Sequence, residues 1–215
     1  MNSVRKILAL NAPLTWLFYG DSITHGAYHT FGLRDYPELF DERVRGEMGR
    51  VSDTVINTAI SGDTTRELLN GFARRVARFQ PDLIFLMIGM NDCSEESGID
   101  LAEFTGNLRR LADLAAGLPA RLCLQTTCPI LKGTAPDREP RFNDFMEAVR
   151  EVARERLLPL IDHTAYWQMH PEQHGRWMSD SFHPNGHGHR VFAGLIFREL
   201  GIQSDSEPSG RFFIP

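Results

Sequence analysis

Cysteine is scarce in this sequence, and the cysteines present are not spaced for a disulfide framework or a zinc knuckle. The 215 residues include three cysteines, Cys93, Cys123 and Cys128, and no Cys-x-x-Cys pair. An odd number leaves at least one thiol unpaired within a single chain. Cys123 and Cys128 lie in an apolar stretch, where a thiol behaves as a small buried hydrophobic group. A reducing compartment fits this pattern best, so we expect a cytoplasmic protein.

Excess positive charge and long apolar runs are also missing. The chain has 23 Lys and Arg against 28 Asp and Glu, a net charge of -5. Nucleic-acid-binding domains are usually clearly basic, so we expect no nucleic-acid partner. No apolar run approaches the ~18 residues that a membrane span needs. Arg5 and Lys6 precede a short apolar stretch that loosely resembles a signal peptide, but Asn11 and Pro13 interrupt it.

Strand-like and helix-like segments alternate along the chain. Short apolar or β-branched runs predict five strands, at 14–19, 54–60, 83–88, 122–127 and 157–161. Apolar residues at helical spacing predict helices over 35–48, 64–79, 104–115, 142–152 and 187–200. Alternation of this kind predicts an α/β fold, with a five-stranded parallel sheet between helices on both faces. We expect one domain over residues 1–202, followed by a tail, 203–215, without regular structure.

Glycines and polar residues follow three of the predicted strands directly. These segments are Gly20-Asp21-Ser22, Ser61-Gly62 and Gly89-Met90-Asn91-Asp92. In open parallel sheets, ligands bind beyond the carboxyl ends of the strands. The three segments are therefore expected to deliver their polar groups to one edge of the sheet.

Ser22, His183 and Asp180 are candidates for nucleophilic catalysis. A serine hydrolase needs an exposed hydroxyl, a base that accepts its proton and an acid that orients the base. Ser22 lies at a strand end, where its hydroxyl can face the solvent edge. Asp180 and His183 are three residues apart, so both side chains can point the same way within one turn. Taken singly, a Gly-Asp-Ser turn or a surface Asp-x-x-His pair is more often only structural.

Gly62 and Asn91 are candidate donors to an oxyanion, through a backbone N–H and a side-chain amide respectively. Such donors stabilise the negative charge that develops on a carbonyl oxygen. The structural alternatives are a permissive bend at Gly62 and a turn residue or helix cap at Asn91.

A zinc site is the main rival, because histidine is frequent in the last third of the chain. His183, His187 and His189 are the closest together, but Pro184, Gly186 and Gly188 separate them. The sequence contains no His-Glu-x-x-His motif, and the cysteines lie elsewhere. We therefore expect no metal and no other cofactor.

Four segments of the chain together resemble the blocks of the GDSL esterases, the SGNH hydrolase family. They are 20–26 (GDSITHG), Ser61-Gly62, 89–92 (GMND, the family's GxND) and 180–184 (DSFHP, the family's DxxHP). They occur in the family's order over nearly the whole chain, from Leu14 to about Leu200. Ile23 departs from the leucine of the family name. No Gly-x-Ser-x-Gly surrounds Ser22, which argues against the nucleophile elbow of the α/β-hydrolases.

The resemblance implies a fold, a mechanism and roles for the residues. It implies a flavodoxin-like three-layer sandwich and a metal-independent serine hydrolase that acts through an acyl-enzyme. Ser22 would be the nucleophile, His183 its base and Asp180 the partner of that base. The N–H of Ser22, the N–H of Gly62 and the Asn91 amide would form the oxyanion hole.

The substrate is less defined than the chemistry. A small-molecule carboxylic ester is expected, such as a short acyl or acetyl ester on a carbohydrate, and homo-oligomers are compatible with the sequence. Aromatic residues and a histidine near Ser22 suit a sugar platform or a packed core: Trp16, Tyr28, His29, Phe31 and Tyr36. Acyl-thioesterase and lysophospholipase activities are alternatives within the family. A non-catalytic binding module of the same fold would require a missing part of the site, and no part is missing.

Overall fold

The computed structural model describes residues 7–8 and 12–209, and it contains a five-stranded parallel sheet. The strands are β1 (Thr15–Gly20), β2 (Thr54–Asn57), β3 (Leu83–Met87), β4 (Arg121–Gln125) and β5 (Leu160–Ile161). Their spatial order is β2-β1-β3-β4-β5, and all four pairings are parallel. This is the order of flavodoxin-like sheets. Every residue of β3 is buried, as expected for a central strand covered on both faces.

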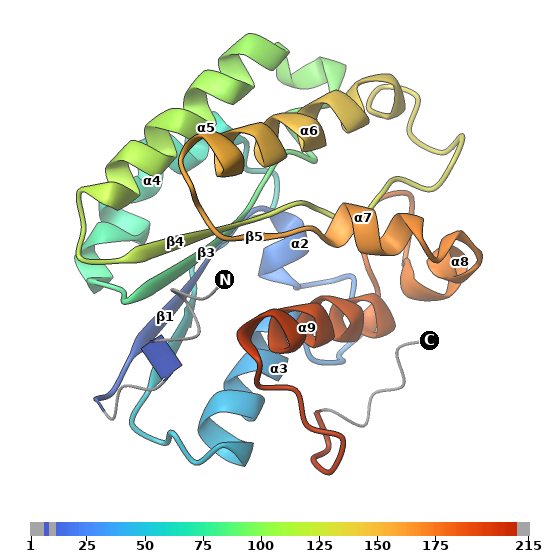
Figure 1. Cartoon of the computed structure of the whole chain (residues 1–215). Coiled ribbons are helices and arrows are strands. Elements are labelled where there is room, and N and C mark those ends of the chain that lie inside the picture. The colour runs from blue at the N-terminus through green and yellow to red at the C-terminus, as the bar shows by residue number, and fades with distance from the viewer. Residues whose placement is uncertain (1–6, 9–11, 210–215) are drawn as a thin grey trace.

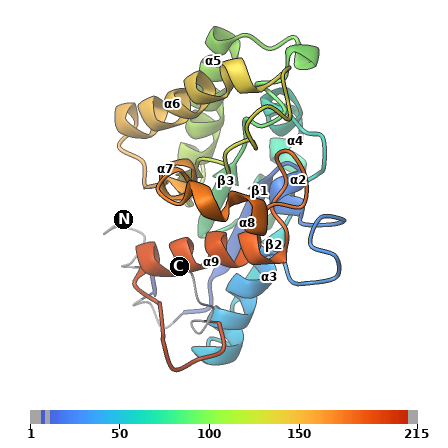
Figure 2. The same cartoon turned by 90° about the vertical axis from the view of Figure 1, so that its right-hand side faces the viewer.

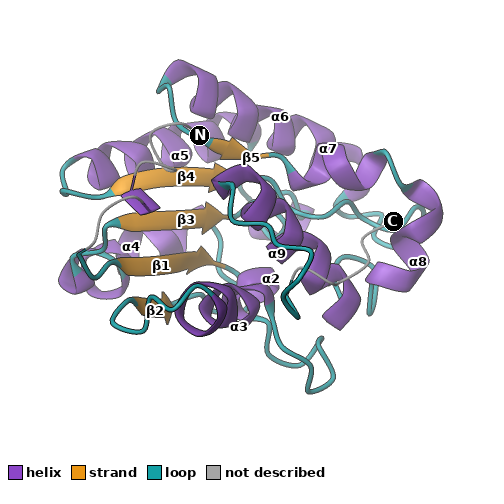
Figure 3. Ribbon diagram, turned by 60° about the horizontal axis from the view of Figure 1, so that its bottom comes forward, coloured by secondary structure: helices purple, strands orange, loops and turns teal. Residues whose placement is uncertain are grey.

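Helices cover both faces of the sheet and confirm the three-layer prediction (Figures 1 and 2). One face carries α4 (Thr65–Arg75), α5 (Leu101–Ala116) and α6 (Glu139–Glu155). The other face carries α3 (Tyr36–Asp41) and α9 (Gly186–Leu200), which pack against each other. Three short helices, α2 (Ser22–His25), α7 (His163–Gln168) and α8 (His174–Trp177), lie toward the end of the sheet to which the strand arrows point (Figure 3).

Local capping interactions explain why two of these helices begin where they do. Thr64 and Glu67 form a capping box at the start of α4. Asp35 and Glu38 form a second capping box at the start of α3. Each box satisfies backbone N–H groups that have no partner in the first helical turn, and a cap contributes about 1 kcal/mol.

Several expected boundaries were wrong. The strand expected over 157–161 is only Leu160–Ile161. Leu157 has φ of 53° and is 91% exposed, because the chain reverses there after α6 and the Leu158 N–H bonds back to the Ala153 carbonyl. The helix expected over 35–48 is α3 followed by a π-helical turn, Glu42–Glu47. The strand expected over 54–60 ends at Asn57, and its last residues form the turn toward Ser61 and Gly62.

The two ends of the chain are only partly described. Residues 1–6 and 9–11 lie outside the described part. They include Arg5, Lys6 and Asn11, on which the comparison with a signal peptide was based. Of the tail, 203–209 contains no helix or strand, as expected. Ser209 nevertheless contacts the π-helical turn, because its N–H donates to Glu47 Oε1 at 2.8 Å. Residues 210–215 are not described.

Over residues 7–8 and 12–209, no helix combines the length and the apolar character that crossing a bilayer requires.

Candidate active site

Ser22 begins the short helix α2, immediately after β1. Asp21 caps this helix, because its carboxylate accepts the N–H of Ile23 at 3.0 Å. Gly20 allows β1 to approach β3 closely, since a Cβ at this position would lie 2.3 Å from the Met87 carbonyl oxygen. The sharp turn leaves Ser22 only 8% exposed but on the wall of a pocket.

The structure brings Ser22, His183 and Asp180 together although Ser22 and His183 are 161 residues apart. Ser22 Oγ lies 2.9 Å from His183 Nε2, and His183 Nδ1 lies 2.9 Å from Asp180 Oδ2. The Asp180 carboxylate also accepts the backbone N–H groups of Phe182 and His183, at 3.0 and 2.8 Å. The backbone of the turn at 180–183 therefore orients the Asp180 carboxylate independently of its contact with the His183 ring. This chain of contacts is the one that serine hydrolases use.

The charges of this trio favour a neutral imidazole beside a carboxylate. Partial burial raises the pKa of Asp180, but the Phe182 and His183 N–H groups and the His183 ring outweigh it and hold that pKa below its ordinary value. Burial lowers the pKa of His183 and outweighs the attraction of Asp180. Asp180 by itself would raise the pKa of His183, but the effect of burial is larger. The His183 side chain is only 12% exposed, whereas Asp180, at 43%, is screened by solvent.

Gly62 and Asn91 line the same pocket as Ser22 and His183. Gly62 has φ of 87°, a left-handed conformation that favours glycine. Asn91 Nδ2 donates one hydrogen bond to the Asp63 carbonyl oxygen at 2.9 Å. An amide nitrogen has two hydrogens, so the second stays available to a ligand.

A buried ion pair holds the turn that carries Gly62. The Asp63 carboxylate contacts the Arg75 guanidinium from α4, and both side chains are less than a tenth exposed. Arg75 also donates from Nε and Nη2 to the Thr58 carbonyl oxygen, at 2.9 and 2.7 Å. The Arg75 side chain thereby contacts both ends of the turn between β2 and α4, at Thr58 and at Asp63.

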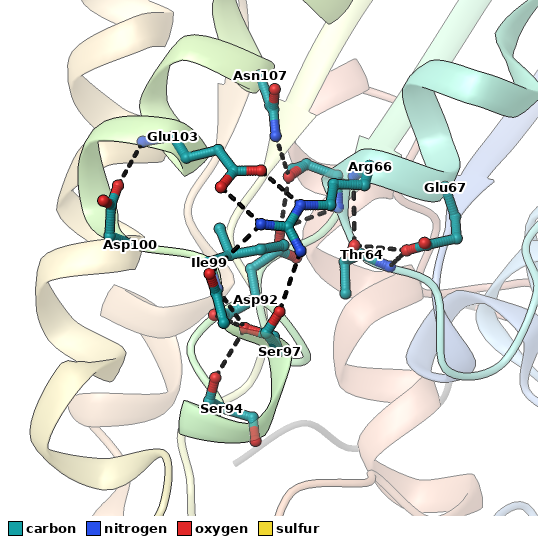
Figure 4. Close-up of polar contacts among 12 residues, drawn as sticks. Thr64, Arg66, Glu67, Asp92, Ser94, Ser97, Ile99, Asp100, Glu103 and Asn107 are labelled. Carbon is teal, nitrogen blue, oxygen red and sulfur yellow. Dashed lines mark hydrogen bonds and ion pairs between the residues drawn. The ribbon is translucent and has the colours of Figure 1, made fainter.

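A polar network fastens the segment after β3 to the starts of α4 and α5 (Figure 4). Asp92, which follows Asn91, is fully buried and accepts the Thr65 N–H and hydroxyl at 2.9 and 2.6 Å. Asn107 of α5 donates to the same Thr65 hydroxyl at 3.1 Å. Burial raises the pKa of Asp92 to about 6. Arg66 of α4 donates to both carboxylate oxygens of Glu103 on α5, at 2.5 and 2.7 Å. The segment that carries Asn91 is therefore held to the start of α4, which directly follows the turn that carries Gly62.

The pocket beside Ser22 and His183 has a volume of about 520 Å³ and a mixed lining. Polar groups come from His25 and Ser61, which hydrogen-bond to each other at 3.0 Å, and apolar surface from Tyr28 and Phe182. A larger hollow of about 720 Å³ lies between α3 and β2, but it is lined mainly by charged residues and contains no serine, cysteine or histidine.

The residues near Ser22 that suited either a sugar platform or a packed core separate into two groups. Trp16 and Tyr36 are fully buried, so the packed-core alternative is confirmed for these two. Tyr28 and Phe31 are 92% and 75% exposed on the loop after α2, and Tyr28 lines the pocket. His29, on the same loop, stacks on the His183 ring, a contact for which the sequence contains no local signal.

The histidines considered for zinc do not share one site. His189 is buried and accepts the Tyr36 N–H through Nδ1 at 3.2 Å, whereas His187 is exposed. Within the described residues, one group of three possible ligands does converge, namely His29, Asp180 and His183. Its two imidazole rings are parallel and 3.6 Å apart, so their in-plane lone pairs run side by side and do not point at a common ion. Metal independence stays a prediction.

A flavodoxin-like sheet with serine, histidine and aspartate in contact at its carboxyl edge defines the class of serine hydrolases that includes esterases. A model of the GDSL-like lipase/acylhydrolase family matches residues 18–191, and the chain belongs to this family. It is therefore a carboxylic ester hydrolase.

Named relatives of similar length include two hydrolases. The chain is 27% identical over 210 residues to an acetylxylan esterase of Geobacillus stearothermophilus, covering 87% of this chain and 94% of the relative. It is 25% identical over 189 residues to a thioesterase 1/protease 1/lysophospholipase L1 of Escherichia coli, covering 86% and 83%. A further relative, an uncharacterized protein of Mycoplasma pneumoniae, is 31% identical over 140 residues, but the match spans only 16% of that protein.

The fold also matches solved structures. The crystal structure of an acetylxylan esterase from Geobacillus stearothermophilus superposes with a TM-score of 0.75, covering 87% of this chain and 94% of that chain at 24% identity. At this identity the likeness concerns the fold alone.

Proposed function

We propose that this esterase removes short acyl groups, acetyl foremost, from hydroxylated small molecules such as carbohydrates, through an acyl-serine on Ser22. The observation that carries the proposal is the 2.9 Å contact between Ser22 Oγ and His183 Nε2 at the wall of an open, partly polar pocket. The other parts of the site supply what a covalent mechanism needs around that contact.

In the first half-reaction, Ser22 Oγ attacks the ester carbonyl carbon while His183 Nε2 takes its proton. The resulting oxyanion is stabilised by the N–H groups of Ser22 and Gly62 and by the free amide hydrogen of Asn91. The intermediate then collapses, the bond to the alcohol oxygen breaks, and the imidazolium gives its proton to that oxygen. An alcohol leaves and the acyl group stays on Ser22.

In the second half-reaction, water replaces the alcohol. His183 accepts a proton from the water, whose oxygen attacks the acyl carbon, and the same donors stabilise the second oxyanion. Collapse returns the proton to Ser22 Oγ and releases the carboxylic acid. Asp180 remains ionised, since its pKa lies below its ordinary value, and it stabilises the imidazolium that forms twice per cycle.

The substrate class is supported by the pocket and by one relative. The polar pair His25 and Ser61 and the exposed Tyr28 ring suit an alcohol that has hydroxyl groups and an apolar sugar face. The acetylxylan esterase of Geobacillus stearothermophilus aligns over nearly its whole length. The Escherichia coli thioesterase/lysophospholipase supports a second candidate, hydrolysis of longer acyl chains from thioesters or lysolipids.

A substrate panel separates these candidates. Purified enzyme is assayed on p-nitrophenyl esters from acetyl to palmitoyl, on acetylated xylooligosaccharides and on an acyl-CoA. We expect kcat/KM to be highest for acetyl and to fall as the chain lengthens, with acetate released from the oligosaccharide. A preference for long chains or for the thioester would favour the second candidate.

Labelling with a fluorophosphonate tests the chemistry independently of the substrate. The wild-type protein is expected to be labelled at Ser22, and Ser22→Ala is expected to be neither labelled nor active while retaining its fold. If Ser22→Ala kept more than a few percent of the activity, the assignment of the nucleophile would be wrong. A wild-type protein that is not labelled would indicate a non-catalytic binding module.

A further inference from the structure

His29 lies flat against the imidazole of His183. The two ring centroids are 3.6 Å apart and the ring planes differ by 4°. His29 also reaches the carboxylate that His183 uses, because His29 Nδ1 lies 3.4 Å from Asp180 Oδ2. Two imidazoles therefore share one carboxylate, and only one of them contacts Ser22 in the structure.

Other neighbours cover less of the His183 ring than His29 does. The Phe182 ring is 4.6 Å from the His183 ring and tilted by 43°. Asp180 and Ser22 contact only the ring nitrogens, at the edge of the ring. Arg138 faces the site through Phe182, with its guanidinium 4.4 Å from the Phe182 ring. His29 thus stacks over one face of the His183 imidazole, with the two rings nearly parallel.

We propose that His29 is a positioning residue for the base: it holds the plane of the His183 imidazole in line with Ser22 Oγ and keeps water from one face of it. The proposal rests on the function proposed above for His183. His29 does not need to exchange a proton with the substrate for this role. Its stacking and its contact with Asp180 restrict rotation of the imidazole, and restricted rotation of a reacting group lowers the entropic part of the barrier.

The loop geometry supports a specific placement of this ring. His29 follows Tyr28, which has φ of 85°, and precedes the buried Thr30. Tyr28 is 92% exposed, whereas the His29 side chain is only 25% exposed. The chain therefore turns so that the histidine packs against the His183 ring, while the tyrosine ring stays largely exposed at the pocket.

Replacement of His29 changes two measurable quantities. His29→Ala removes the ring cover, the Asp180 contact and the charge of His29, whereas His29→Phe keeps a flat ring and removes the contact and the charge. Burial is the main cause of the lowered pKa of His183, and repulsion from His29 and Arg138 adds to it. Both variants remove the His29 repulsion, but only His29→Ala also exposes one face of the ring, so the pKa of His183 should move upward in both and further in His29→Ala. We expect kcat for p-nitrophenyl acetate to fall roughly tenfold in His29→Ala with little change in KM, since looser positioning acts on the chemical step.

The test follows the protonation of His183 directly. The Cε1–H resonance of His183 is titrated by NMR in the wild type, in both variants and in His187→Ala, a matched loss of an exposed histidine on α9. His29→Ser replaces His29→Ala if the alanine variant does not fold. An upward shift of the His183 midpoint together with the loss of kcat supports the proposal, and His187→Ala should show neither. A wild-type midpoint or a wild-type kcat in the variant that lacks the ring overturns it.

Failure of this proposal can be told from failure of the proposed function. If the fluorophosphonate labels wild-type Ser22 but the His29 variants match the wild type, only the role of His29 is wrong. If wild-type Ser22 is not labelled, the catalytic assignment is wrong, and the NMR midpoints still report whether His29 covers His183.

Discussion

At the scale of single residues, Asn91 has one amide hydrogen committed to the Asp63 carbonyl oxygen, so its second hydrogen has a fixed direction. If this hydrogen meets the oxyanion, the contact is stronger in the tetrahedral intermediate than with the ground-state ester. Asn91→Ala should therefore lower kcat by roughly 10²–10³-fold with little change in KM. Asn91→Asp should lose at least as much, because a carboxylate repels the oxyanion.

Thermal stability measured on the same samples distinguishes this role from a structural one. If Asn91 only completes the turn after β3, both variants should lose melting temperature while each remaining active site works at the normal rate. A large loss of stability with an unchanged rate per titrated site would remove Asn91 from the mechanism.

The protonation of His183 predicts how activity depends on pH. His183 must be neutral to accept the Ser22 proton, and burial lowers its pKa. As pH rises, kcat/KM should increase in a single step with its midpoint below the ordinary histidine value of about 6.5. The pH dependence of kcat/KM for p-nitrophenyl acetate measures this midpoint. A profile flat between pH 4 and 8, or a midpoint well above 6.5, would contradict the assignment of His183 in this environment.

Metal removal is expected to leave the activity unchanged. The possible ligands His29, Asp180 and His183 are already engaged with one another or with Ser22. Dialysis against EDTA followed by assay in metal-free buffer should give the rate of the untreated enzyme. Loss of activity that zinc restores would reinstate a metal site.

At the scale of elements, the turn between β2 and α4 depends on the buried pair of Asp63 and Arg75. Removing one partner of a buried ion pair leaves a charge without compensation, which costs about 3–5 kcal/mol. Arg75→Met should lower the free energy of unfolding by this order, and it should also reduce kcat because Gly62 and the Asp63 carbonyl lose their anchor. Urea unfolding and steady-state kinetics on one preparation measure both effects.

An exposed ion pair serves as the control. Arg109 of α5 contacts Glu155 of α6 at 2.9 Å, and both side chains are nearly half exposed. Arg109→Met should cost less than about 1 kcal/mol and leave kcat unchanged. Equal effects of the two substitutions would show that the Arg75 pair has no special role in the turn.

The boundaries of the helices and strands show which local sequence signals were sufficient to predict where an element begins or ends. The start of α4 was predictable because Thr64 and Glu67 satisfy each other's backbone within one helical turn. β5 was predicted too long, since Leu157 and Leu158 are apolar but belong to a reversal after α6. The helices α2, α7 and α8 have six residues or fewer, too few to show a hydrophobic period.

At the scale of the whole molecule, two buried histidines link folding to pH. Burial lowers the pKa values of His163 and His189 to about 3. Below pH 6.5 the unfolded chain binds protons at these positions and the folded chain does not, so their contribution to stability falls as pH drops toward 3. Asp21 and Asp35, whose pKa values burial raises to about 7, act in the opposite direction.

Substitution isolates the histidine contribution. His163 is fully buried and lies 2.9 Å from Gln125 through Nε2. His163→Gln should be less stable than the wild type at pH 7, and the difference should shrink as pH falls from 6.5 to 4.5, because the variant has no imidazole to protonate. Urea unfolding at several pH values measures the difference. A difference that stays constant over this range would mean that the pKa of His163 is the same in the folded and unfolded states.

The sequence by itself determined the class of fold and the members of the candidate site. Apolar runs and helical spacing are local properties, so the alternation of strands and helices, and with it the parallel sheet, was predictable. The rule that parallel strands present their carboxyl ends at one edge was enough to group Ser22, Gly62 and Asn91. Asp180 and His183 could be paired because they lie within one turn.

Only the tertiary structure decided the environment of those residues. The 2.9 Å contact of Ser22 with His183, the stacking of His29 and the burial that lowers the pKa of His183 join segments far apart in the chain. Asp180, three residues away in the sequence, would by itself raise the pKa of His183. The burial that lowers this pKa cannot be read from the sequence. Desolvation and packing depend on everything that surrounds a side chain, and that is settled only when the whole chain has folded.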